Sequence, residues 1–245
     1  TNKVFTGTKP AQPFLNYALM YIIASVPKDN NINIHESIVL KNINQLNIST
    51  ILGVGNTYDK FNQLFEIDKF TFLNKIIIDF SKFENINLAK NFKSKSVKNI
   101  IAKNFNGSLK WLENFKQIED LYLSFEKYNQ KIENLVCFDV LRNLKKLEIN
   151  CEGLTDIDFL SNCESLKNLI LYNNKWGSTL KNIETLSDLK NLQVLEISNI
   201  DEHLNLSVIN RCLNINVLSL GFKNTFHVKH SIGSENLKIF NLRLD

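Results

Sequence analysis

Cysteine is scarce in this chain of 245 residues, and its spacing excludes the sites that cysteine usually builds. The cysteines form no Cys-x-x-Cys pair, match no zinc-ligand spacing, and are sparser than in a disulfide-stabilised secreted domain. The four are Cys137, Cys151, Cys163 and Cys212. We therefore predict free, buried thiols in a reducing compartment. This favours a cytoplasmic protein, with a secreted protein as the alternative.

Long apolar runs are also missing. The longest extends from Phe14 to Val26, is interrupted by Asn16 and Ser25, and is too short to span a bilayer. Two lysines precede the run, so a signal peptide is one interpretation. We instead interpret residues 1–40 as an N-terminal cap segment whose apolar face is this run, because the end of a repeat stack needs a cover.

The excess of positive over negative charge is also small. The formal net charge is +4 and the pI is about 8.7, which makes nucleic acid an unlikely partner. The most basic stretch runs from Lys90 to Lys103, and no aromatic stacking platform accompanies it. We interpret this stretch as a solvated face, with an anionic surface as the alternative ligand.

No catalytic constellation can be placed on the sequence. The spacing of His227 and His230 is compatible with metal binding, but no cysteine or carboxylate ligand accompanies them. On a strand, this spacing also puts the two rings on opposite faces. The segment Gly53-Val54-Gly55 lacks the third glycine and the lysine of a phosphate loop. We predict no enzyme, no metal site and no cofactor.

What the sequence does contain is a repeated pattern, with apolar residues at its first, fourth and sixth positions. Nine copies follow one another at a mean step of about 24 residues. Their fourth-position residues are Leu46, Ile76, Ile100, Leu121, Leu147, Leu169, Leu195, Leu218 and Phe240. Each copy predicts a short strand with its apolar side chains inward, and stacking of the copies pairs these strands into a parallel sheet.

The pattern resembles the leucine-rich-repeat family from about residue 40 to the end, and the segment 153–174 is most similar to the short-repeat, internalin-like type. The resemblance implies an α/β solenoid of about nine repeats over residues 41–245. Its curved parallel sheet would form the concave side, and short helical or 3-10 segments would form the convex side.

One feature departs from the family pattern. The family places an asparagine three residues after the last strand leucine, and only Asn174 does so here, although the chain contains 36 asparagines. The position two residues after the last strand residue holds Thr50, Phe80, Asn104, Phe125, Cys151, Asn173, Asn199 and Phe222. We therefore expect aromatic packing to replace part of the asparagine ladder.

The resemblance also implies that a ligand engages the concave face. There, Ile77, Ile101 and Tyr122 should lie side by side with charged residues around them, which is the anatomy of a protein interface. The plainer alternative is that β-branched residues simply suit strands. The predicted partner-binding residues are Lys75, Ile77, Ile101, Lys103, Asp120, Tyr122, Glu148, Ile170, Tyr172, Val194 and Glu196.

These observations predict a module that binds another protein. One form is an inhibitor or immunity-type protein, and another is a bacterial effector or surface adhesin that binds a host protein. Both forms rest on family analogy. A third alternative is a structural assembly subunit, in which the chain forms a homo-oligomer through an uncapped C-terminal edge.

Overall fold

The computed structural model describes the chain in nine segments, namely residues 43–47, 71–82, 93–105, 109–125, 142–151, 154–172, 180–200, 205–222 and 235–244. The predicted N-terminal cap at residues 1–40 lies outside these segments, as do His227 and His230. Among the described residues, no helix has the length and apolar character needed to cross a membrane.

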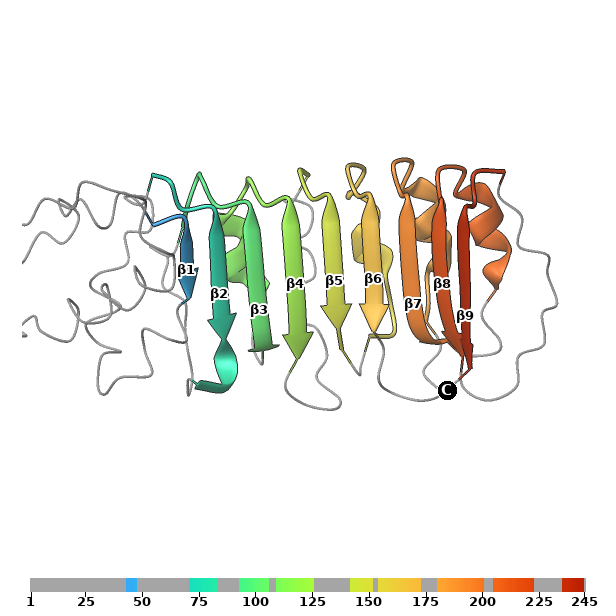
Figure 1. The fold of residues 1–245 in the computed structure, drawn as a ribbon, viewed down its shortest axis with the longest axis horizontal. Coiled ribbons are helices and arrows are strands. Elements are labelled where there is room, and N and C mark those ends of the chain that lie inside the picture. Colours follow the sequence, from blue (N-terminus) through green and yellow to red (C-terminus); the bar gives the residue numbers. More distant parts are fainter. Residues whose placement is uncertain are drawn as a thin grey trace, which may run out of the picture.

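The described segments contain nine strands that form one parallel sheet in sequence order (Figure 1). The strands are β1 (Gln45–Asn47), β2 (Lys75–Asp79), β3 (Asn99–Phe105), β4 (Asp120–Phe125), β5 (Lys146–Asn150), β6 (Asn168–Tyr172), β7 (Val194–Ile200), β8 (Val217–Phe222) and β9 (Ile239–Leu244). Every predicted fourth-position residue pairs with its counterpart in the next repeat, from Leu46↔Ile76 to Leu218↔Phe240. The predicted solenoid of about nine repeats is therefore confirmed.

A shared main-chain acceptor joins each repeat to the next. The carbonyl of the residue before a strand accepts two amide hydrogens from the following repeat, as when Lys98 O accepts from Glu119 N at 2.8 Å and from Asp120 N at 3.0 Å. The same arrangement recurs at all eight junctions, with the acceptors Asn44, Asn74, Lys98, Glu119, Lys145, Lys167, Gln193 and Asn216. These bonds set the register before the strands begin.

Asparagine side chains add a second ladder at the same turns. Asn191 Nδ2 donates to Glu164 O at 2.8 Å, so the amide of one repeat binds the main chain of the repeat before it. Asn143, Asn214 and Asn236 make the equivalent bond to Lys116, Lys190 and Leu213. Part of the asparagine content is thus explained by the turns that enter the strands.

Aromatic packing occurs where the strands end, as expected, but at a shifted residue in β3. A bulge in β3 pairs Phe105, and not Asn104, with Phe125, and the rings of Phe105 and Phe125 lie 5.9 Å apart. Asn104 is the extra residue of this bulge and adopts a left-handed conformation, with φ of 52°. In β3, Phe105 therefore takes the place in the register that the sequence pattern gave to Asn104. Strand β7 has a similar shift, so that Ile200 takes the place expected for Asn199.

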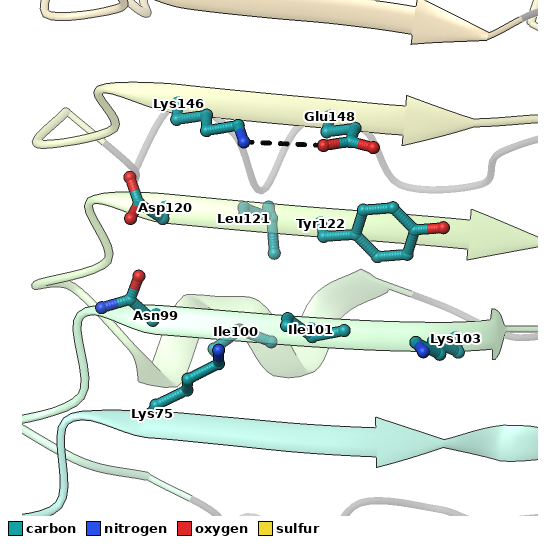
Figure 2. Close-up of a pocket in the computed structure, with 10 residues that line it drawn as sticks. All are labelled: Lys75, Asn99, Ile100, Ile101, Lys103, Asp120, Leu121, Tyr122, Lys146 and Glu148. Carbon is teal, nitrogen blue, oxygen red and sulfur yellow. Dashed lines mark ion pairs between the residues drawn. The ribbon is translucent and has the colours of Figure 1, made fainter. Parts of the chain in front are cut away.

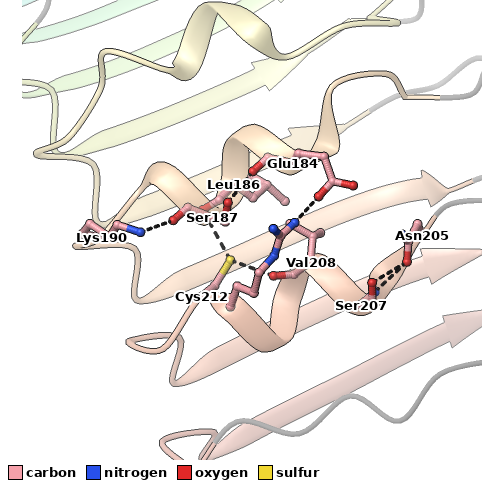
Figure 3. A network of polar contacts seen from close by, with 9 residues as sticks. Glu184, Leu186, Ser187, Lys190, Asn205, Ser207, Val208 and Cys212 are labelled. Carbon is pink, nitrogen blue, oxygen red and sulfur yellow. Dashed lines mark hydrogen bonds and ion pairs between the residues drawn. The ribbon is translucent and has the colours of Figure 1, made fainter.

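Short 3-10 helices in the return segments lie behind the sheet in Figure 1 and close the core. They are η4 (Leu109–Asn114), η6 (Asp158–Leu160), η7 (Ile183–Asp188) and η8 (Leu206–Arg211), whereas η3 (Phe80–Lys82) directly follows the lower end of β2 in the figure. In the return segments, Ile157, Leu160, Ile183 and Leu186 are buried in the core. The ion pair between Arg211 and Glu184 links η8 to η7 (Figure 3).

Three of the four cysteines lie in described segments, and all three are buried thiols, as predicted. Cys212 packs between η7 and η8, with its Sγ 3.4 Å from Leu186 O and 3.6 Å from Val208 O (Figure 3). Burial raises the pKa of the Cys212 thiol to about 11, which keeps it protonated at neutral pH. Cys137 lies outside the described residues.

Strand β9 differs from the other strands in its exposure. Its apolar residues Ile239, Phe240 and Leu242 are 44–49% exposed, whereas the matching residues Leu218 and Leu220 of β8 are fully buried.

The alternation of buried and half-buried residues within a strand makes a testable prediction. Leu169→Ala should lower the free energy of unfolding by roughly 2–5 kcal/mol, because it leaves a cavity in the core. The neighbouring Ile170→Ala should cost markedly less, because Ile170 lies half-buried on the opposite face of β6. Urea unfolding followed by circular dichroism measures both, and equal costs would contradict the register.

Candidate interaction surface

In the part of the chain that the structure describes, the helices η4, η6, η7 and η8 lie behind the sheet and leave its other face open (Figure 1). We call it the open face; it corresponds to the concave side of the sequence prediction. Residues on this face alternate with core residues along each strand, as in the half-buried, buried pattern of β2 and β5. The register of the strands therefore decides which side chains become neighbours there.

The register places Ile77, Ile101 and Tyr122 next to one another on β2, β3 and β4. All three side chains are half-buried, because each rests against its neighbours on the face. This is the apolar row that the sequence predicts. Its members are held by main-chain pairing, so they need no rearrangement to form one continuous surface.

A hollow of about 420 Å³ lies over β2–β5 on this face (Figure 2). Its lining comprises Lys75, Asn99, Ile100, Ile101, Lys103, Asp120, Leu121, Tyr122, Lys146 and Glu148. Lys75, Asp120 and Lys146 lie at the ends where the strands begin, and Lys103 lies toward the opposite end of β3 (Figure 2). The hollow is an open depression with an apolar centre and charged margins, large enough to accept a side chain of a partner.

The charges at the margin are mostly uncompensated. Lys146 and Glu148 form an ion pair with 3.7 Å between Nζ and Oε2. In the part of the chain that the structure describes, Lys75, Lys103 and Asp120 form no ion pair. These three groups remain available to a ligand in the hollow.

A second group of predicted residues lies farther along the open face, on β6 and β7. Burial raises the pKa of the Tyr172 phenol above its ordinary value of 10, and the negative charges of Glu196 and Glu148 raise it further. Tyr172 therefore stays a neutral hydrogen-bond donor over the physiological pH range. Ile170 and Val194 lie half-buried on the same face, Ile170 two residues before Tyr172 and Val194 opposite Asn168 at the start of β7.

The open face is partly closed beyond β7. Arg243 on β9 reaches Glu196 on β7, with 3.7 Å between Nη1 and Oε1. This ion pair bridges β8, where the intervening residues Ser219 and Gly221 are small and buried. The surface open to a partner therefore extends mainly over β2–β6.

Six of the eleven predicted residues line the hollow, namely Lys75, Ile101, Lys103, Asp120, Tyr122 and Glu148. Ile77 borders it through Ile101, whereas Ile170, Tyr172, Val194 and Glu196 belong to the second group. Asn99 and Lys146 also line the hollow but were not among the predicted residues. Both occupy the same repeat position as Lys75 and Asp120, and this shared position is the sequence signal that could have identified them.

Among the described residues, no group of three or more His, Cys, Asp or Glu side chains is placed to hold a metal ion. The chemistry of the open face is that of charged, amide and apolar contacts. Those are the groups from which binding surfaces are built.

No protein-family model and no curated protein matches the chain, whereas several solved structures are similar to it. An internalin (inlF) from Listeria monocytogenes is similar in structure at 14% identity and a TM-score of 0.44, over 84% of this chain and 65% of that one. Internalin C2 (inlC2) from the same organism is similar at 18% identity and a TM-score of 0.40, over 74% and 82% of the two chains. An LRR protein from Leptospira interrogans has 16% identity and a TM-score of 0.32, over 64% and 51%.

The chain has the fold of a leucine-rich-repeat solenoid. This assignment rests on its own nine repeats, on their register and on the single parallel sheet. The chain spans 65% of the length of the first of these structures and 51% of the third.

A three-residue ion bridge runs along the strand-entry edge of this leucine-rich-repeat solenoid. Glu119 accepts from Lys98 Nζ at 2.6 Å through one oxygen and from Lys145 Nζ at 2.7 Å through the other. These bonds, Lys145 first and Lys98 second, hold the pKa of the Glu119 carboxyl at about 2, below its ordinary value of 4.5. The bridge spans three repeats and fixes the position of two lysines beside the hollow.

The bridge can be tested by following the carboxyl signal of Glu119 by NMR. Its titration midpoint should lie at about 2 and should move back toward 4.5 when Lys145→Ala and Lys98→Ala are combined. Because the folded pKa is lowered, the stability that the bridge contributes is present above about pH 4.5 and is lost as the pH falls toward 2. Lys167→Ala is the control and should leave the midpoint in place. A wild-type midpoint near 4.5 would show that the bridge does not form.

Proposed function

We propose that this solenoid is a protein-binding module that holds its partner on the open face over β2–β6, and that it is not an enzyme. The observation that carries the proposal is the row of Ile77, Ile101 and Tyr122, with Lys75 and Lys103 beside it. Contiguous apolar groups on a surface favour association, and unpaired charges around them select the partner.

Two features of the surface support a protein as the ligand. An apolar row with charged margins matches the core and rim of a protein interface, in which a few buried aromatic or aliphatic anchors provide most of the binding free energy. The hollow is also an open depression and lacks the enclosure that a small-molecule site provides. Tyr122 is the best-placed anchor, because tyrosine combines a large apolar area with a hydrogen-bonding tip.

Within this class, we propose an inhibitor or immunity-type protein that blocks an enzyme or toxin. A bacterial effector or surface adhesin that binds a host protein is the alternative. The identity of the captured partner separates the two, since the first requires an enzyme or toxin and the second a host protein.

The test is an affinity capture from a lysate of the source organism with quantitative mass spectrometry. The open-face variant combines Ile77→Asp with Tyr122→Ala. The matched control combines Leu213→Asp with Phe72→Ala, which makes the same kinds of change at side chains that are 70% and 67% exposed outside the hollow. We expect the open-face variant to lose its partner by at least about tenfold, equivalent to about 1.4 kcal/mol, and the control to retain it.

Two outcomes would contradict the proposal. Capture of the same proteins by the wild type and by the open-face variant would exclude the open face as the binding site. Capture of an untagged second copy of the chain, equally by both, would instead support an assembly subunit. The specific observation that favours this second candidate is the exposure of Ile239, Phe240 and Leu242 on β9.

A further inference from the structure

The turns that lead into β3, β4, β5 and β6 form a strongly basic edge of the sheet, at the top of Figure 1. We call it the basic rim, and its exposed cations are Lys93, Lys95, Lys98, Lys116, Arg142, Lys145 and Lys167. Three carboxylates lie among them, those of Glu119, Asp120 and Glu164. The excess of four positive charges at this edge is as large as the formal net charge of +4 of the whole chain.

Stacking of the repeats concentrates these cations. In the sequence they are spread over residues 93–167, but neighbouring strands lie only about 4.8 Å apart, so the strands β3–β6 span about 14 Å. The basic stretch singled out in the sequence is also divided by the fold. Lys93, Lys95 and Lys98 join the rim, whereas Lys103 lies farther along β3 beside the hollow.

Most cations of the rim are not paired with a carboxylate in the described part of the chain. Glu119 binds Lys98 and Lys145 and compensates part of their charge. The remaining five form no ion pair within the described segments, and these are Lys93, Lys95, Lys116, Arg142 and Lys167. Isolated exposed cations at this density create a positive potential that a ligand of opposite charge can neutralise.

The basic rim is continuous with the hollow. Asp120 and Lys146 line the hollow at the strand-entry ends of β4 and β5, next to the turns of the rim (Figure 2). A partner protein that places an apolar side chain over Ile101 and Tyr122 therefore extends over the rim as well. The two surfaces can contact one partner at the same time.

We propose that the basic rim binds an acidic patch on the protein that occupies the hollow. This inference rests on the proposed function and adds the charge of the partner to it. Two features favour an acidic protein over a nucleic acid. The adjoining hollow has an apolar centre, which fits side chains better than phosphates. The rim is also interrupted by Glu119 and Glu164, which would repel a continuous phosphate backbone, whereas acidic side chains of a protein can be placed between them.

The test uses poly-L-glutamate as an acidic polypeptide and a DNA duplex of matched net charge as the competing probe. Binding of the full chain is measured by fluorescence anisotropy at about 50 mM and about 200 mM salt, a range over which surface charge is progressively screened. The rim variant combines Lys95→Glu, Arg142→Glu and Lys167→Glu, which leave the Glu119 bridge intact. The control combines Lys110→Glu, Lys181→Glu and Lys238→Glu, which change the net charge equally at exposed sites outside the rim.

We expect the rim variant to bind poly-L-glutamate about tenfold more weakly than the wild type at low salt and to lose most of the salt dependence. The control should remain within about twofold of the wild type. Equal weakening in both variants would show that only net charge matters and would overturn the inference. Tighter binding of the DNA duplex than of poly-L-glutamate would also overturn it, in favour of a nucleic-acid surface.

The proposed function can fail separately from this inference. The open-face variant Ile77→Asp/Tyr122→Ala leaves the rim intact, so it should bind poly-L-glutamate like the wild type. A partner that depends on the open face but is held equally well by the rim variant would overturn the acidic patch alone. Binding of poly-L-glutamate by the rim, without any partner that depends on the open face, would leave the rim in place and remove the proposed function.

Discussion

At each junction between repeats, the main-chain carbonyl before a strand accepts two amide hydrogens from the next repeat, and the rest of the structure depends on this bond pair. The pair fixes the register of every strand at its first residue. A slip of one residue would turn each apolar row from the core to the open face. Asparagine amides strengthen four of these junctions, and a buried stripe of aliphatic side chains then stacks behind the sheet. Local turn chemistry and long-range burial therefore favour the same register.

Much of this fold can be predicted from the sequence, because the apolar spacing of a parallel strand must repeat wherever the core does. Leu147, Leu169 and Leu195 could be aligned for that reason alone. The bulge in β3 could not be predicted, since an uninterrupted period of two places Asn104 inward, whereas its left-handed backbone brings Phe105 there instead. The asparagine ladder at the entering turns was also missed, although its donors Asn143, Asn191, Asn214 and Asn236 share one repeat position, because their acceptors are main-chain carbonyls that residue identity does not reveal.

The candidate surface could likewise be predicted only in part from the sequence. The positions of Ile77, Ile101 and Tyr122 follow directly from the register, so the sequence predicted them as neighbours. The ion pairs between side chains of different strands could not be predicted from the register. Arg243 reaches over β8 to Glu196 and thereby limits the open face, and Glu119 collects two lysines from adjacent repeats. Such contacts depend on side-chain lengths and rotamers, which a repeat pattern does not specify. The basic rim arises in the same way, because charges that are distant in sequence meet only when the repeats stack.

The most direct test of this account is whether the apolar row forms on the open face. In a methyl-labelled sample, NMR should show nuclear Overhauser contacts between the methyl groups of Ile77 and Ile101, and between those of Ile101 and the ring of Tyr122. Both contacts follow from the paired register of β2, β3 and β4. Contacts of Ile101 with the buried Leu109 and Leu112 in their place would mean that the strand is turned by one residue. That result would contradict the register and, with it, the surface on which the proposed function rests.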